Sequence, residues 1–547
     1  MKKILLVLIL LISIKGFSQT GVQISKPFKV VDAPKKLYFN NGKSVLSVKI
    51  KGGFITLQVF DVEKMTEVAR NEYKDIFKGG YIEDVIRFKD KFYFIYTLWD
   101  KPNETEQVFA REINPYKGVI LDKQISLFKY KGRMAGKLTS SANVTLNIFN
   151  VWSSLEIDKL NLDNYSYDST KFLIQFRIKP EEKRDKLSYD EIGYYVFNDK
   201  LELLSGNVVK MPYTEKKMDN IDYSIDATGN VYTLAAVFDD DTRKRKKKDG
   251  TPNFHTEILK LPFGKDKLKI IPIDLKDKFI DRIGMFESST NDIICAGSYF
   301  NKIKSSFLKD DITAVNGVFV FKLNESGDVF DNKCFEFPID IINQYEKKKT
   351  VRKNENKDDD EKSEFSELIL KNLKIQDDGS FVLIGEQDYF RDYTTPTSNG
   401  GTKTHIKFFY EDILITKIGS DGNLAWMKKL PKRQVGDKGI GGLSYRYLKG
   451  EKDHYIIFLD NEKNINLPIN KEPATHVDEA GGFVTAYKIN DETGKVTKHS
   501  LYDLRNVKGM DLKQFSTRRV LQTSLSDFLI EFYKKDKEDV YIKTKLP

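Results

Sequence analysis

Residues Tyr223–Phe238 read YSIDATGNVYTLAAVF, which is an alternating strand, a turn at Ala227–Asn230 and a second, more apolar strand. Gly and Asn suit such a turn because hairpin turns need positive φ angles. The pattern recurs in Leu373–Gln387 (LKIQDDGSFVLIGEQ) and Ile415–Leu430 (ITKIGSDGNLAWMKKL). Hairpins that repeat every ~40–60 residues are typical of small sheets arranged radially, so the sequence predicts an all-β fold, a β-propeller.

Each propeller blade has four antiparallel strands, a to d, with strand a innermost. The candidate a–b hairpins lie near Leu37–Ile50, Ile82–Trp99, Tyr165–Ile178, Tyr223–Phe238, Met285–Phe300, Leu373–Gln387, Leu443–Leu459 and Val520–Tyr533. The candidate c–d hairpins lie at Gly53–Tyr73, Val108–Phe128, Ile192–Met211, His255–Ile273, Gly317–Phe337, Asp412–Leu430 and Gly482–Tyr502.

The last a–b hairpin is followed by only one further strand, Val540–Lys545, while Val22–Val31 precedes the first blade without a partner. We therefore expect the N-terminal strand to complete the last blade and to close the ring. Closure removes the exposed sheet edges that favour aggregation. The pattern predicts eight blades, and seven is the alternative.

The N-terminus combines MKK, the apolar run ILLVLILLISI and the polar exit KGFSQT, which is typical of a secretory signal peptide. A membrane anchor is the alternative, but Lys15 interrupts the run and a spanning helix needs about 20 apolar residues. We expect a signal peptide at 1–19 and a single propeller domain at 20–547. The expected location is periplasmic or outer-membrane associated, with secretion as the alternative, and the mature chain is not expected to span the membrane.

The chain carries 90 basic and 80 acidic residues, a formal charge of +10, and some of the excess lies in the signal peptide. This mixed surface fits solubility better than nucleic-acid binding. The two cysteines, Cys295 and Cys334, are expected on the second and fourth strands of one blade. Such strands lie roughly 9–10 Å apart, beyond disulfide reach, so the sequence predicts two free, buried thiols.

Two inserts interrupt the blades. The first, at about 129–162, contains the apolar run Leu146–Leu155. The second, at about 338–367, opens with a predicted short helix (IDIINQYEKKK) and continues as VRKNENKDDDEKSE, which is too charged to bury and is predicted to be disordered.

The connections between strands b and c are mostly long, unlike the turns within the hairpins. They span about Asp100–Gln107, Lys179–Glu191, Asp239–Phe254, Asn301–Asn316, Asp388–Glu411 and Asn461–Gly481. All b–c connections of a propeller emerge on one face, and insertions in repeat proteins often collect on the binding face. The sequence therefore predicts a contact surface there, and unselected insertions are the alternative.

The candidate contact residues lie in or beside these loops and inserts. They are Arg243, Lys244, Arg245 and Lys246 of a basic run, His255, His405 and His476, and Trp152 of the first insert. The basic run could hold an acidic glycan, a lipid phosphate or an acidic protein, or it is a hydrated tip balanced by Asp239–Asp241. No HxH, HExxH, GxSxG, P-loop or CxxC pattern is present, so neither a metal, a cofactor nor a catalytic residue is predicted.

The hairpin Glu411–Leu430 (EDILITKIGSDGNLAWMKKL) resembles bacterial propeller repeats of the D-I-x-V-x-K-x-x-x-x-G-x-x-x-W kind. More broadly, the chain resembles uncharacterised secreted propeller proteins of Bacteroidota bacteria. The stretches that carry this resemblance are IGYYVFNDKLELLSGNVVKMPY, NIDYSIDATGNVYTLAAVF, NDIICAGSYF and the GFSQ signal exit. The resemblance implies an exported propeller and no particular reaction.

Together these features favour a non-enzymatic binding or scaffold propeller of the cell envelope that engages a protein or glycan partner through its long b–c loops. The alternative is a hydrolase or lyase acting on a polysaccharide or peptide, with an acidic site at the channel mouth. A third interpretation is a structural subunit of an envelope assembly that docks through Leu146–Leu155.

Overall fold

The computed structural model describes twelve stretches of the chain. For three short strands, β12 (Glu156–Asp158), β22 (Ile303–Lys304) and β23 (Ile312–Thr313), it describes the backbone alone. The stretches are 21–135, 156–158, 165–179, 187–244, 247–249, 251–301, 303–304, 312–358, 362–396, 399–437, 441–479 and 481–547. The predicted signal peptide and the apolar run Leu146–Leu155 lie outside them.

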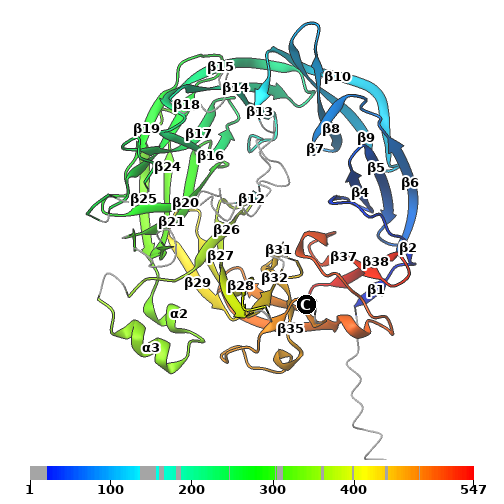
Figure 1. Cartoon of the computed structure of the whole chain (residues 1–547), viewed down its shortest axis with the longest axis vertical. Helices are drawn as coiled ribbons and strands as arrows, with labels where there is room; N and C mark the ends of the chain where they lie inside the picture. Colours follow the sequence, from blue (N-terminus) through cyan, green and yellow to red (C-terminus); the bar gives the residue numbers. More distant parts are fainter. Residues whose placement is uncertain are drawn as a thin grey trace, which may run out of the picture.

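Eight antiparallel sheets stand side by side in a ring, which confirms the predicted propeller and its eight blades (Figure 1). Five blades follow the simple order a-b-c-d. They are β3 (Lys35–Asn41), β4 (Ser44–Lys51), β5 (Phe54–Asp61) and β6 (Thr66–Lys74); β7 (Gly80–Phe88), β8 (Lys91–Asp100), β9 (Thr105–Asn114) and β10 (Val119–Lys131); β16 (Met218–Ile225), β17 (Val231–Phe238), β18 (Phe254–Leu261) and β19 (Lys269–Ile273); β20 (Phe279–Glu287), β21 (Ile293–Phe300), β24 (Gly317–Leu323) and β25 (Val329–Glu336); and β31 (Arg446–Lys449), β32 (Asp453–Asp460), β34 (Phe483–Asn490) and β35 (Val496–Asp503).

The third blade departs from the prediction at its innermost strand. Its sheet order is β11 (Met134–Ala135), β13 (Lys171–Ile178), β14 (Tyr189–Asn198) and β15 (Leu203–Thr214). Met134 pairs with Ile178, whereas Tyr165 forms only an isolated bridge to Phe172. The predicted hairpin Tyr165–Ile178 is therefore wrong in its first half, because the insert at 129–162 splits the inner strand into two pieces.

The described part of that insert ends far from its own blade. Strand β12 (Glu156–Asp158) pairs in parallel with β26 (Leu368–Ile375), the inner strand of the sixth blade. Figure 1 shows β12 on the inner side of the ring, beside β26.

The sixth blade contains β26, β27 (Phe381–Pro396), β28 (Thr402–Ile418) and β29 (Leu424–Leu430). Two short strands, β30 (Gln434–Gly436) and β33 (His476–Val477), extend its sheet beside β28. This blade differs most from a four-stranded propeller blade, because β27 and β28 extend beyond its other strands.

The last blade combines both ends of the described chain. It consists of β36 (Val520–Gln522), β37 (Asp527–Lys534) and β38 (Glu538–Lys545), joined by β1 (Val22–Ile24) and β2 (Phe28–Lys29). The register pairs Val22 with Thr544 and Phe28 with Asp539. The predicted pairing of the N-terminal strand with the C-terminal strand is thus confirmed.

The hydrophobic core lies between neighbouring blades rather than within them. Each large apolar cluster draws on two adjacent sheets; Phe286 and Ile294 of the fifth blade, for example, pack with Leu373 and Phe381 of the sixth. The first and last blades pack in the same way, through Phe28, Val45, Phe60, Leu529 and Tyr541. Blades are held together because each sheet buries both faces against its neighbours.

Cys295 is buried on β21 and Cys334 is half-buried on β25, the second and fourth strands of the fifth blade, and they form no disulfide. This matches the predicted strand positions, although Cys334 is less buried than expected.

Two short helices, α2 (Ile339–Asn343) and α3 (Lys348–Glu355), follow the fifth blade. The segment from Val351 was predicted to be disordered, yet Val351–Glu355 forms the second half of α3. The buried Asn354 explains the difference, since its amide donates to Asn343 Oδ1 of α2 at 2.8 Å and ties the two helices together. Single-turn 3-10 helices lie at Glu462–Asn464, Leu504–Asn506 and Thr517–Arg519. None of the helices in the described ranges is long and apolar enough to cross a membrane.

Candidate functional site

The b–c connections gather on one face of the ring, which we call the loop face. Its loops include 239–253 and 301–316, and the 461–482 loop carries the short strand β33. The opposite face, the turn face, carries the short a–b and c–d turns. One predicted long loop is wrong: β8 and β9 stay paired out to Asp100 and Thr105, so this connection is a tight turn.

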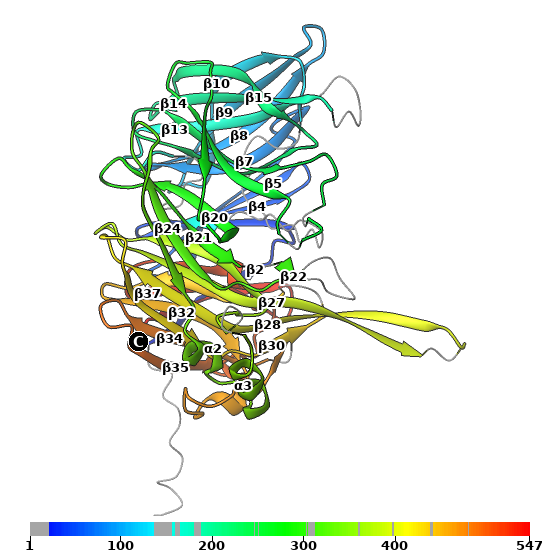
Figure 2. The ribbon, with the colours of Figure 1, turned by 90° about the vertical axis from the view of Figure 1, so that its left-hand side faces the viewer.

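The predicted loop at Asp388–Glu411 is also wrong, and it is the most informative error. Strands β27 and β28 remain paired from Asp388 opposite Tyr410 to Pro396 opposite Thr402. Figure 2 shows this two-stranded ribbon projecting from the loop face, far beyond the other connections. We call residues 389–409 the arm. At about 3.4 Å per residue, its paired length is about 25 Å.

A β-bulge marks the point where the arm leaves the blade. The register shifts between the pairs Glu386–Ile413 and Asp388–Tyr410, so β28 contains one extra residue here. A bulge bends the strand and increases its twist, which lets the ribbon turn away from the sheet.

Charged side chains surround this bulge, and we call Lys371, Glu386, Asp412, Lys429 and Lys432 the arm root. All of them are buried except Lys371, which is half-buried. The Nζ atom of Lys432 lies 2.8 Å from a Glu386 oxygen, and Lys371 contacts both Glu386 and Asp388 (2.8 Å). Ser444 donates its hydroxyl to Glu386 at 2.6 Å. The carboxylates of Glu386 and Asp412 are fully buried.

Lys429 connects the arm root to α2. Its Nζ lies 3.2 Å from Asp412 and also donates to the main-chain oxygens of Ile342 and Gln344, at 3.0 and 2.8 Å. A cation at the C-terminal end of a helix satisfies carbonyl groups that have no partner within the helix. One lysine therefore fixes the position of the helical insert against the arm root.

The pKa values at the arm root reflect this network. Burial would raise the pKa of Glu386, but Lys371 and Lys432 outweigh it and hold that pKa below its usual range. Burial lowers the pKa of Lys432 despite Glu386, while Asp388 and Glu386 outweigh burial and raise the pKa of Lys371. Breaking one member of such a buried network typically costs about 3–5 kcal/mol.

Aromatic residues stabilise the base of the arm on both of its faces. The rings of Tyr389 and Phe409 stack at 4.9 Å, and those of Phe390 and Phe408 lie 6.3 Å apart on the other face. The Tyr389 hydroxyl donates to Glu411 at 3.0 Å, and the Arg391 guanidinium lies 4.9 Å above the Tyr389 ring. Beyond Phe390 and before Phe408 the described arm residues are exposed.

The three predicted histidines occupy different environments. His405 lies on the exposed arm, where its Nε2 is 3.0 Å from Thr395 Oγ1. His255 lies between Asp239 (3.0 Å) and Glu257 (3.1 Å), and the hydrogen bond to Glu257 is the main factor that raises its pKa. His476 is buried in β33, and burial lowers its pKa to about 4, so its expected role in surface contact is corrected to a core position.

Two residues of the basic run at Arg243–Lys248, Arg243 and Lys247, are engaged with acidic side chains. Arg243 donates two hydrogen bonds of 2.6 Å to Asp219 and further bonds to main-chain oxygens. Lys247 pairs with Asp239 at 2.6 Å, and Lys244 is exposed. Arg245, Lys246 and Trp152 lie outside the described residues. Arg243 therefore ties the loop to β16, and Lys247 ties it to its own first residue, Asp239.

Sequence reasoning missed the residues that line the arm. These are Tyr389, Arg391, Tyr393, Lys403 and Lys407. Only the composition favoured a strand, since aromatic and β-branched residues are frequent on both sides of Asn399–Gly401.

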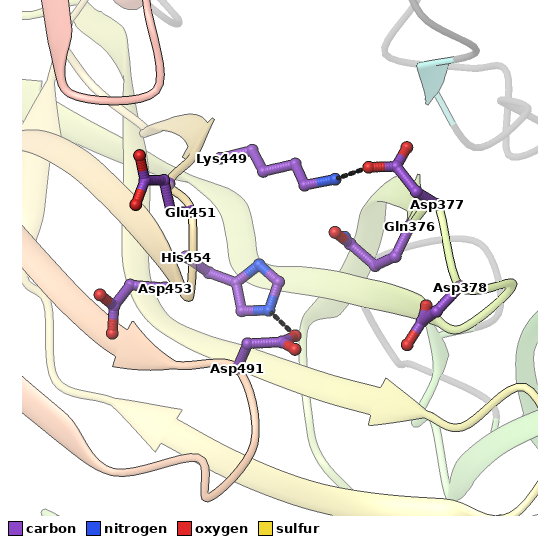
Figure 3. Close-up of a pocket in the computed structure, with 9 residues that line it drawn as sticks. Gln376, Asp377, Asp378, Lys449, Glu451, Asp453, His454 and Asp491 are labelled. Atoms are coloured by element: carbon purple, nitrogen blue, oxygen red, sulfur yellow. Dashed lines mark hydrogen bonds and ion pairs between the residues drawn. The ribbon is translucent and has the colours of Figure 1, made fainter.

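A small pocket lies on the turn face, between the sixth and seventh blades (Figure 3). Its volume is about 180 Å³, and Lys449 crosses it to reach Asp377 at 3.0 Å. Both ring nitrogens of His454 are hydrogen-bonded. Nε2 lies 2.7 Å from Asp491, and Nδ1 lies 2.9 Å from the Tyr447 hydroxyl. Burial is the main cause of the lowered pKa of His454.

This pocket is smaller than the 300–1,000 Å³ of a usual ligand site. Both nitrogens of His454 are already bound within the protein, and Lys417 also pairs with Asp491 at 2.7 Å. These polar side chains are therefore hydrogen-bonded or ion-paired to one another, and neither His454 nitrogen is available as a general base. Among the described residues, no three His, Cys, Asp or Glu side chains come together as a metal site.

Comparisons with known proteins show no family for this chain. No family model and no curated protein matches the chain. Among solved structures, the chain is similar to the Dos1 propeller at 7% identity, covering 96% of this chain and 95% of that one, with a TM-score of 0.38. It is also similar to the β-propeller domain of the Trilobed protease from Pyrococcus furiosus at 8% identity, covering 88% and 96%, with a TM-score of 0.30.

A prolyl endopeptidase is a third similar structure, at 11% identity and a TM-score of 0.35, covering 95% of this chain and 55% of that chain. The chain thus spans about half of the peptidase. Since all three TM-scores lie below 0.5, the propeller assignment rests on the eight blades themselves.

Proposed function

We propose that this protein is an exported binding or scaffold propeller of the cell envelope, which engages a protein or glycan partner through its loop face. The observation that carries the proposal is the arm. It places about 25 Å of exposed ribbon in solvent, whereas an isolated two-stranded hairpin is only marginally stable in water.

Two further observations support a binding role for this face. The arm root holds the direction of the arm with buried, charge-assisted hydrogen bonds, so the arm is a positioned element. The neighbouring loop 461–482 is also fixed to it, because β33 pairs in parallel with β30, which pairs with β28. Functional sites are typically loops and extensions placed by a rigid scaffold.

The test is affinity purification from the native envelope with an arm-deletion variant. Phe390 and Phe408 lie directly opposite each other, so replacing residues 391–407 with Asn-Gly closes the hairpin with a two-residue turn and keeps the arm root. We expect this variant to lose the partners that the parent protein retains.

The matched control is D377N/K449Q on the turn face, which removes an exposed ion pair and leaves the loop face unchanged. This control should retain every partner. If the arm-deletion variant also retained every partner, the arm would have no role in binding and the proposal would fail.

The hydrolase alternative has less support. The turn-face pocket is small, and its histidine is fully engaged with Asp491 and Tyr447.

A further inference from the structure

The strand edges of the arm differ from those of the blades. On its outer side β27 pairs with β26 only as far as Gln387, and β28 pairs with β30 only through Phe408–Tyr410. Beyond these points no other strand in the described ranges joins the ribbon. Each arm strand therefore presents a row of main-chain N–H and C=O groups to solvent, which is a template for a further strand.

The two edges are not equally suited to that role. The β28 edge carries Lys403 and Lys407, and lysine is a residue that proteins use to block strand addition. The β27 edge reads RDYTT (391–395) before Pro396 ends it at the tip. Thr and Tyr favour extended structure, so β27 is the better template.

The two faces of the arm carry different side chains, because directly opposite residues of an antiparallel pair share a face. One face pairs Arg391 with Lys407, Tyr393 with His405 and Thr395 with Lys403. It has three basic side chains, and none of these six positions is acidic. We call it the basic face.

The other face is nearly uncharged. It pairs Phe390 with Phe408, Asp392 with Ile406 and Thr394 with Thr404. Ile406 on this face is 39% exposed, and Tyr393 on the basic face is 44% exposed. Apolar surface is therefore accessible on both faces.

We infer that the β27 edge of the arm accepts an extended segment of a partner protein as an added strand, and that acidic and apolar residues alternate in this segment. An added strand directs successive side chains to opposite faces of the ribbon. Every second residue would lie beside Arg391, Tyr393 and Thr395, where a carboxylate meets Arg391 directly and the field of Lys407 and Lys403 on the next strand. The intervening residues would lie beside Phe390, Asp392 and Thr394, and β-branched apolar side chains fit beside Phe390 and Thr394.

This mode explains the exposed ribbon better than a purely electrostatic surface does. Main-chain hydrogen bonds provide affinity in strand addition, and alternate side chains provide specificity. A third strand also gives the ribbon the sheet size at which β-structure becomes independently stable. The inference rests on the proposed binding function and names the class of its partner.

The probe is a fluorescent eight-residue peptide of alternating Glu and Val, titrated against the mature full-length protein and followed by anisotropy. We expect saturable binding that weakens at least threefold between 50 and 200 mM salt, since exposed ion pairs are screened. A peptide of alternating Lys and Val should not bind. No binding of the Glu/Val peptide at 1 mM would overturn the inference.

Two further measurements separate strand addition from charge attraction alone. Two Glu/Val peptides carry N-methyl groups on alternate residues, one on the Glu residues and the other on the Val residues. Each keeps its charge and loses the N–H donors along one edge. At least one of the two should bind tenfold more weakly than the parent peptide. If both N-methylated peptides bind as the parent peptide does, or if a polyanionic glycan or oligonucleotide competes equally well, the arm is an unspecific cationic surface and the inference is wrong.

The protein variant is R391E/K407E, which reverses the net charge of the basic face and also removes the Arg391 cation above the Tyr389 ring. It should weaken peptide binding at least tenfold. Its matched control, K123E/K129E, makes the same charge change at exposed positions of β10 and should bind as the parent protein does. Equal binding by R391E/K407E and the parent would overturn the role assigned to the basic face.

The outcomes also separate this inference from the proposed function. If arm deletion abolishes capture of envelope partners while no Glu/Val peptide binds, the binding propeller stands and the strand-addition mode falls. If neither effect is seen, both proposals fail.

Discussion

The contact between the first and last blades contains a buried charge cluster with an unusual imbalance. Lys49 and Lys36 lie 2.7 and 3.1 Å from the Glu531 carboxylate, and the Tyr38 hydroxyl also donates to it at 2.9 Å. Asp539 lies beside them, but both lysine Nζ atoms are 3.9 Å away and neither of its carboxylate oxygens has a hydrogen-bond partner. The geometry therefore assigns both lysines to Glu531.

The pKa values of the two acids diverge for this reason. Burial and the neighbouring Glu531 raise the pKa of Asp539 from 3.8 to about 6. Although burial opposes it, the pKa of Glu531 falls to about 2, because Lys49 and Lys36 hold its charge. In the folded protein Asp539 thus keeps its proton to a higher pH than in the unfolded chain, and Glu531 loses its proton at a lower pH.

We predict that D539N increases the free energy of unfolding, relative to the parent protein, by more at pH 8 than at pH 4. For an acid with a raised folded pKa, the folded state binds more protons between pH 3.8 and about 6, so stability falls as the pH rises through that window. A shift of about two units at about 1.36 kcal/mol each gives a penalty of about 3 kcal/mol above pH 6. Asn has nearly the same shape and carries no charge, so it removes the penalty.

The assay is urea-induced unfolding of parent and variant at several pH values, followed by fluorescence. The difference in free energy of unfolding, variant minus parent, should rise by about 2.4 kcal/mol between pH 4 and pH 8, because part of the penalty is already present at pH 4. The control D199N changes an exposed aspartate whose pKa is lowered by Lys89, so its difference should not rise over this range. A flat or falling difference for D539N would show that Asp539 is charged and paired in the folded state, which would refute the assignment of both lysines to Glu531.

Three further predictions concern the rest of the ring. Deleting residues 21–29 should lower the midpoint of thermal unfolding and produce aggregates on gel filtration. The deletion exposes the edge of β38 and removes Phe28 from the contact between the first and last blades. An unchanged midpoint and an unchanged elution profile would argue against a structural role for this strand. G297A should destabilise the protein by about 3 kcal/mol or more in urea unfolding, since its Cβ would lie 1.8 Å from a main-chain oxygen; its neighbouring control is A296G, which should not distort the backbone. A thiol reagent should modify Cys295 only after unfolding and Cys334 slowly before it, because Cys295 is buried and burial raises the pKa of the half-buried Cys334; rapid modification of both in the native protein would contradict these positions.

The blades could be predicted because their signal is local. In Tyr223–Phe238, the turn forms where expected: Asp226 Oδ1 accepts from the Asn230 amide at 2.8 Å and Gly229 has a φ of 94°. Strands β16 and β17 pair directly on either side of this turn. Turn chemistry and alternation lie within about fifteen residues here, so one sequence suffices to read them.

The arm could not be predicted with the same reasoning, because both of its faces are in solvent. Period-2 alternation between apolar and polar residues identifies a strand that has one buried face. Residues such as Thr394, Thr395 and Thr404 favour strands but are polar, so a polar segment with a central Asn-Gly-Gly was interpreted as a loop. The chemistry of a strand edge is visible only once pairing partners are known.

The arm root was equally invisible, since Lys371, Glu386 and Lys432 come from separate parts of the blade and charged residues make up 31% of the chain. Their burial raises a physical question, because replacing a buried ion pair by apolar residues is often neutral or stabilising. Buried charges can instead select one geometry, and here they lie at the bulge that directs the arm. The hypothesis predicts that K371M/E386L/K432M remains folded but gives a broader distribution of distances between spin labels on the arm and on the blade. A distribution as narrow as that of the parent would show that the β28–β30–β33 pairing alone directs the arm, and that the buried charges have no orienting role.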